Sequence, residues 1–148
     1  MTCRNEIQKM KNLFLLITLS TFSFAQESIK YPVFPGCNKY KTNEELSKCF
    51  SEKLWYELND QTKDSGEDFY KENKLAHDLT LYFTVKKDGK VAGYSFSKDS
   101  DALISTTYLK RISKVFKYYE QKGKNIIPAS QNNKYKDFIV TFKVKYEG

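Results

Sequence analysis

The sequence predicts an α+β domain in which a small antiparallel sheet, made of a hairpin and a C-terminal strand, carries two helices on one face. Two runs of β-branched and aromatic residues flank the dipeptide Asp88-Gly89, an arrangement typical of a β-hairpin. Two longer segments repeat apolar residues at steps of three and four, which favours helices. Because a hairpin alone is marginal in water, we expect the helices and a further strand to cover its apolar face.

The first 25 residues have the pattern of a secretory signal peptide. A basic start precedes the apolar run Leu13–Phe22, and small residues follow it up to Ala25. We expect translation to start at Met10, residues 1–25 to be the signal peptide, and cleavage after Ala25 to leave residues 26–148 as one exported domain. The alternative, an uncleaved membrane anchor, needs about 20 apolar residues, and this run is shorter.

The net charge of the chain is +7 and falls to +5 without the leader, which holds three basic residues and one acidic residue. The lysines are spread along the sequence and form no stripe. This distribution indicates a solvated basic surface, so we expect no nucleic-acid partner.

Two cysteines, Cys37 and Cys49, remain after Cys3 is removed with the leader. An even count in an exported protein predicts a disulfide, which the chain-entropy model values at roughly 2–3 kcal/mol for a loop of this length. A metal site is the alternative. We expect none, because the one histidine, His77, is distant in sequence and is interpreted as a surface residue.

The first helix is predicted from a capping box, in which Thr42 caps the amide of Glu45 and the Glu45 carboxylate reaches back. Residues 26–41 before it contain prolines and a glycine, so they are expected to be extended. The helix is expected to end at about Asn59. Its apolar stripe comprises Leu46, Cys49, Phe50, Leu54, Trp55 and Leu58.

A polar connection, with a short helical turn near Asp68–Leu75, is expected to lead to the hairpin. The hairpin arms are Leu79–Val85 and Val91–Ser97, and one face of the first arm is apolar. Gly89 supplies the positive φ that the turn needs.

The second helix is expected to run from a capped turn at residues 98–101 to about Gln121, with Gly123 as its stop signal. Its apolar residues are Leu103, Ile104, Tyr108, Leu109, Ile112, Val115, Phe116 and Tyr119. Its lysines are compatible with a membrane surface as the alternative, but a solvated face is the favoured interpretation. Residues 125–136 are then predicted to be a loop.

The last element is a strand over Asp137–Tyr146, because every second residue from Phe138 is apolar and the residues between them are largely polar. One face is predicted to be buried. The other face carries Ile139, Thr141, Lys143 and Lys145.

The chain resembles the C-terminal domain of the energy transducer TonB, in the branch of the family with paired cysteines. The resemblance covers about Tyr31–Tyr146 and is carried by Pro32-Val33-Phe34-Pro35-Gly36-Cys37, Lys48-Cys49-Phe50-Ser51-Glu52-Lys53, Lys87-Asp88-Gly89-Lys90-Val91, Pro128 and Ile139-Val140-Thr141-Phe142-Lys143-Val144. It implies a periplasmic module whose edge strand pairs with the TonB box of an outer-membrane transporter. The family's uncleaved anchor and Pro-rich spacer are not expected here, so the module would not itself transmit the proton-motive force.

The candidate partner-binding residues are Ile139, Thr141, Lys143 and Lys145 on the last strand, because an exposed edge offers unpaired backbone groups to an extended peptide. Two alternatives remain open. Lys143 and Lys145 would only guard the edge against aggregation, or the protein would be a structural homodimer joined through the same edge.

An enzyme is not expected, because the mature chain has a single histidine, no nucleophile-elbow motif and no phosphate-binding glycine loop. We therefore expect no catalytic residue, no cofactor, no metal and no small-molecule substrate.

Overall fold

A computed structural model describes residues 28–64 and 77–145. The predicted signal peptide, the helical turn near Asp68–Leu75 and Tyr146 lie outside the described residues. No helix in the described ranges is both long enough and apolar enough to cross a bilayer.

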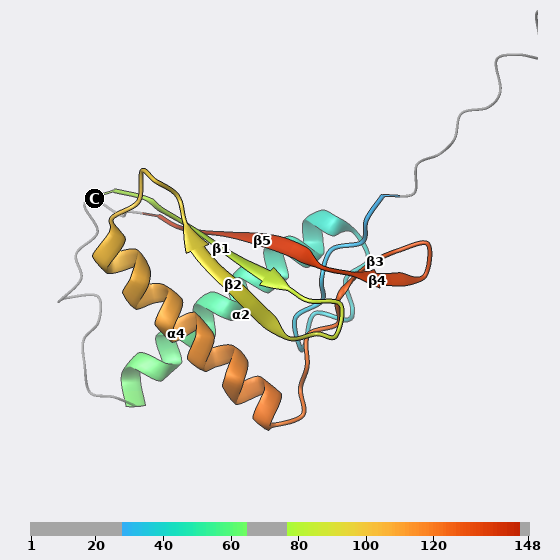
Figure 1. The fold of residues 1–148 in the computed structure, drawn as a ribbon. Coiled ribbons are helices and arrows are strands. Elements are labelled where there is room, and N and C mark those ends of the chain that lie inside the picture. The colour runs from blue at the N-terminus through green and yellow to red at the C-terminus, as the bar shows by residue number, and fades with distance from the viewer. Residues whose placement is uncertain (1–27, 65–76, 146–148) are drawn as a thin grey trace, which may run out of the picture.

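The predicted α+β fold class is confirmed. A three-stranded antiparallel sheet has the order β2-β1-β5, and a separate hairpin joins β3 to β4 (Figure 1). In chain order the elements are α2 (Asn43–Asp64), β1 (Leu79–Val85), β2 (Val91–Phe96), α4 (Ala102–Gln121), β3 (Ala129–Gln131), β4 (Lys134–Lys136) and β5 (Phe138–Val144).

Both helices pack on the same face of the sheet. The central strand β1 alternates buried and half-buried residues along its whole length, as a strand with one covered face does. Ring contacts join the layers: the Phe83 centroid on β1 lies 6.1 Å from that of Phe50 on α2 and 5.2 Å from that of Phe116 on α4. The inward residues of β1, β5 and the two helices thus form one core.

The capping box of α2 is confirmed. Thr42 Oγ1 accepts a hydrogen bond from the Glu45 amide at 3.2 Å, and Glu45 Oε2 accepts one from the Thr42 amide at 3.2 Å. The helix extends to Asp64, beyond the predicted end at Asn59, because no glycine or proline interrupts residues 59–64. Trp55, predicted within the apolar stripe, lies at its margin with 36% of its surface exposed.

Helix α4 begins and ends where the sequence predicts. Asp101 caps it by accepting a hydrogen bond from the Ile104 amide at 2.8 Å. Gly123 follows the last turn with a φ of +67°, a conformation that favours glycine. Leu103 is the exception to the predicted apolar face, since it is 78% exposed at the first turn of the helix.

The predicted loop over residues 125–136 is wrong in part, because it contains the β3–β4 hairpin. The turn between the strands is Asn132-Asn133, with φ values of +51° and +58°. A two-residue turn with two positive φ angles matches the twist of a hairpin, and asparagine tolerates it. The extended segment before α2 also pairs with this region, through bridges from Lys30 to Ser130 and from Val33 to Ile127.

The predicted disulfide joins Cys37 to Cys49, whose Cα atoms are 6.0 Å apart. Both cysteines are buried, with Cys37 fully enclosed. The bond ties the loop before α2 to the second turn of that helix. The loop is further held by the Asn43 side chain, which accepts a hydrogen bond from the Tyr31 amide at 2.7 Å.

The turn between β1 and β2 fits closely against the segment that follows α4. Gly89 has a φ of +84°, and a Cβ at this position would come within 2.6 Å of the Ile126 carbonyl oxygen. Glycine is therefore required here both by conformation and by space.

Candidate peptide-binding edge

Strand β5 lies at the edge of the main sheet. It pairs with β1 along its whole length, from Leu79–Val144 to Val85–Phe138. Within the described ranges no strand pairs with its other side. Among the described strands, β5 is therefore an edge strand with one unpaired side.

The hydrogen bonds of β1 show which backbone groups of β5 are free. The Thr80 carbonyl accepts from the Ser97 amide at 2.9 Å, so Thr80 directs its backbone groups toward the β2 side. Because backbone groups alternate in direction along a strand, Leu79, Leu81, Phe83 and Val85 direct theirs toward β5.

The partners of those four β1 residues on β5 are Val144, Phe142, Val140 and Phe138. Their N–H and C=O groups form the hydrogen bonds between β5 and β1. The residues between them, Ile139, Thr141 and Lys143, consequently direct their backbone groups away from β1. Three N–H and three C=O groups then face outward along β5.

The structure brings the four predicted site residues together on the uncovered face of the sheet. Ile139 is 66% exposed, and Thr141 and Lys143 are exposed beside it. Lys145 is also exposed but follows the end of β5 at Val144. A peptide strand added to β5 would therefore contact one large apolar side chain, Ile139, and one lysine, Lys143.

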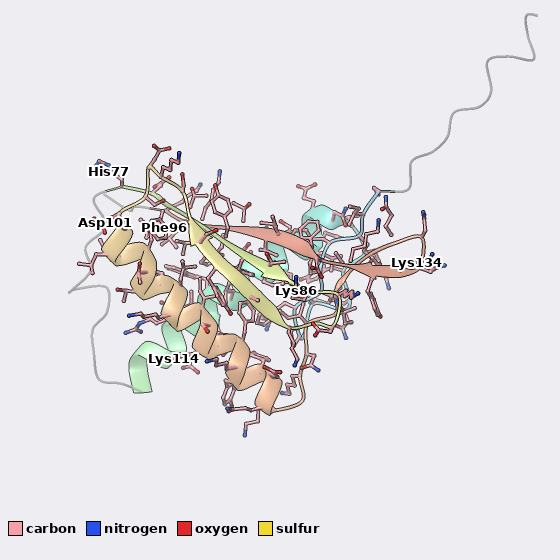
Figure 2. The ribbon with its side chains drawn as sticks, viewed as in Figure 1. His77, Lys86, Phe96, Asp101, Lys114 and Lys134 are labelled. Carbon is pink, nitrogen blue, oxygen red and sulfur yellow. A yellow bond between two sulfur atoms is a disulfide. The ribbon has the colours of Figure 1, made fainter. Side chains whose placement is uncertain are left out.

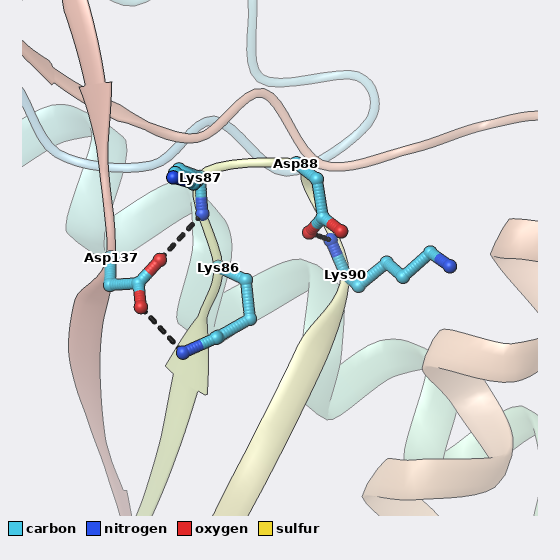
Figure 3. A network of polar contacts seen from close by, with 5 residues as sticks. All are labelled: Lys86, Lys87, Asp88, Lys90 and Asp137. Carbon is cyan, nitrogen blue, oxygen red and sulfur yellow. Dashed lines mark hydrogen bonds and ion pairs between the residues drawn. The ribbon is translucent and has the colours of Figure 1, made fainter.

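Asp137 fixes the start of β5 against the turn between β1 and β2. Its Oδ1 accepts a hydrogen bond from the Lys87 amide at 2.8 Å, and its Oδ2 pairs with the Lys86 ammonium (Figure 3). These two contacts, the Lys86 side chain first, hold the pKa of Asp137 below its ordinary value of 3.8. The carboxylate thus helps to position the edge strand.

The contribution of Asp137 to stability is expected to depend on pH. Its pKa is lowered in the folded state, so its stabilising effect is complete above about pH 4 and is lost as the pH falls through the folded pKa. The variant Asp137→Asn should therefore unfold at a lower urea concentration than the wild type at pH 7. The difference between the two midpoints should shrink in acid.

Comparing the wild type with Asp137→Asn at each pH isolates the contribution of Asp137 to stability. Contacts with Thr42 and Lys41 also lower the pKa of Glu45, but that effect is present in both proteins and cancels. A midpoint difference that stays constant from neutral to acidic pH contradicts this role for Asp137.

The structure extends the candidate edge beyond the predicted residues. Only Asp137 separates β4 from β5, and in the part of the chain that the structure describes β4 pairs only with β3. Tyr135 on β4 is 59% exposed. The sequence signal for this extension is the dipeptide Asn132-Asn133, a weaker hairpin turn than Asn-Gly.

His77 is exposed and precedes β1, at the end of the molecule opposite the hairpin tip marked by Lys134 (Figure 2). Among the residues with a described placement, no group of three or more His, Cys, Asp or Glu residues could hold a metal ion.

The described residues form a small α+β domain in which β5 is an edge strand of the main sheet. Comparisons with protein-family models, with curated proteins and with solved structures give no match.

Proposed function

We propose that this domain is a non-catalytic periplasmic module that binds an extended segment, the TonB box of an outer-membrane transporter, by adding it as a strand to β5. The observation that carries the proposal is the outward direction of the backbone groups of Ile139, Thr141 and Lys143. The cysteine-containing motifs and the final strand, which resemble the TonB C-terminal domain, support the same function.

Main-chain hydrogen bonds would supply much of the affinity. Each such bond contributes about 0.5–1.5 kcal/mol net, so several along β5 suffice for a specific but reversible complex. Alternate side chains of the bound segment would lie beside Ile139 and Lys143, which gives selectivity. The Cys37–Cys49 disulfide is consistent with an exported protein, because such bonds persist in oxidising compartments.

The variant Lys143→Pro tests the proposed edge. Proline removes the outward N–H of residue 143, and its ring obstructs the approach of an added strand, while the bonds from β5 to β1 remain. We expect the affinity for a synthetic TonB-box peptide to fall by roughly tenfold or more, measured by titration calorimetry.

The matched control is Lys143→Ala, which removes the side-chain charge but keeps the N–H. If binding depends on the backbone, Lys143→Ala should lose much less affinity than Lys143→Pro. Equal losses in both variants would assign the effect to the lysine charge. Unchanged binding by Lys143→Pro, in a variant whose circular dichroism matches the wild type, contradicts the proposed edge.

The homodimer is the competing function, because the same open edge could pair with its copy. Sedimentation velocity with and without peptide distinguishes the two. If the protein binds the transporter segment, adding the peptide should raise the sedimenting mass by the mass of the peptide. A tight dimer that is indifferent to the peptide supports the structural function instead.

A further inference from the structure

A groove of about 300 Å³ lies along the opposite edge of the main sheet, between β2 and the C-terminal half of α4. Its apolar lining includes Val91 and Tyr94 from β2, Phe116 from α4 and Ile126 from the segment after α4. Volumes of about 300–1,000 Å³ are typical of ligand sites. The groove is separate from β5, because β1 lies between the two edge strands.

Backbone groups at the outer edge of β2, beside the groove, point away from β1. The register pairs Val91 with Val85, and the backbone groups of Val85 are directed toward β5. Val85 and Val91 therefore form a non-hydrogen-bonded pair, so the N–H and C=O of Val91 point away from β1. Gly93, with a φ of +65°, lies at an irregularity in the pairing and presents no side chain at this edge.

The rim of the groove is basic. Lys90 Nζ lies 3.8 Å from Glu120 Oε1, so these two charges offset each other. Lys117 and Lys124 also line the groove and are exposed. Neither has an ion-pair partner in the described portion of the chain, which leaves two positive charges beside an apolar floor.

We propose that this groove is a second peptide site, which binds an extended segment with alternating acidic and apolar side chains. The backbone of the segment pairs with Val91, its apolar side chains contact Phe116 and Tyr94, and its carboxylates approach Lys117 and Lys124. Charge complementarity selects an acidic over a basic segment. The module would then hold one partner at each edge of its sheet.

The test uses a fluorescein-labelled hexapeptide of alternating glutamate and valine, with fluorescence anisotropy as the readout. The double variant Lys117→Glu/Lys124→Glu is expected to bind it at least roughly tenfold more weakly, because two attractions become repulsions. The matched control is Lys110→Glu/Lys114→Glu, which changes the net charge equally on the same helix outside the groove. The loss of binding free energy in this control should be less than half of the loss in Lys117→Glu/Lys124→Glu.

A peptide with lysine in place of glutamate and the variant Lys143→Pro complete the test. The basic peptide should bind weakly or not at all, and Lys143→Pro should leave the glutamate peptide bound as in the wild type. The proposal is overturned by equal losses in the two double variants, by loss of binding in Lys143→Pro alone, or by no saturable binding below about 1 mM. Because β5 is tested separately with the TonB-box peptide, failure of one site is distinguishable from failure of the other.

Discussion

Replacing Phe83 by alanine is expected to destabilise the domain by about 3–5 kcal/mol, the cost typical of removing a buried aromatic ring. Phe83 lies on the central strand and has no exposed surface. Its ring contacts Phe50 on α2, Phe116 on α4 and Tyr94 on β2, at centroid distances of 6.1, 5.2 and 6.5 Å. The substitution thus opens a cavity where both helices meet the sheet.

Urea denaturation followed by circular dichroism measures this effect. The matched control is Leu103→Ala on α4, since Leu103 is also apolar but is 78% exposed. Because the site is exposed, the Leu103→Ala substitution should change the free energy of unfolding by no more than about 0.5 kcal/mol. Similar losses in the two variants would show that Phe83 does not hold the layers together.

The fold class follows from the sequence because each main element has a strong local signal. The period of apolar residues, the cap at Thr42 and the several cap candidates within residues 98–101 identify the helices, and Asp88-Gly89 identifies the hairpin. An apolar residue at every second position of Phe138–Val144 identifies β5 and its buried face. These signals lie within one element each, so no knowledge of the tertiary structure is needed.

The β3–β4 hairpin was missed because its strands carry no such pattern and its turn, Asn132-Asn133, is a weaker signal than Asn-Gly. Lys134, Tyr135 and Lys136 are all exposed, so burial does not constrain the side chains of β4. Its strands are held by main-chain pairing, to which almost any residue contributes equally. The bridge from Lys30 to Ser130 joins segments a hundred residues apart, and a local reading of the sequence does not reveal it.

The groove beside β2 is also a product of packing. Its walls come from β2, from α4 and from the segment after α4, and their proximity depends on how α4 crosses the sheet (Figure 1). From the sequence, Lys117 and Lys124 belong to a general basic surface. The structure places them around Phe116 and Ile126, next to backbone groups that point away from β1.

Loss of the Cys37–Cys49 disulfide is expected to destabilise the domain by roughly 2–3 kcal/mol. The bond joins residues 12 apart in sequence, and opening it restores the freedom of that loop in the unfolded chain. Because Cys37 is fully buried, truncation of the side chain adds a packing loss to this effect. The free energies of unfolding of the oxidised wild type, the reduced wild type and the variant Cys37→Ala/Cys49→Ala should therefore decrease in that order.

The reduced wild type separates the two causes, because it keeps both sulfur atoms in the core but lacks the cross-link. If the cross-link dominates, reduction alone produces most of the loss, and the slope of the free energy against urea rises as the unfolded chain expands. If packing dominates, the reduced protein stays close to the oxidised one and only the double variant is strongly destabilised. Identical urea midpoints for all three proteins would show that the bond contributes nothing to holding the loop before α2 on the helix.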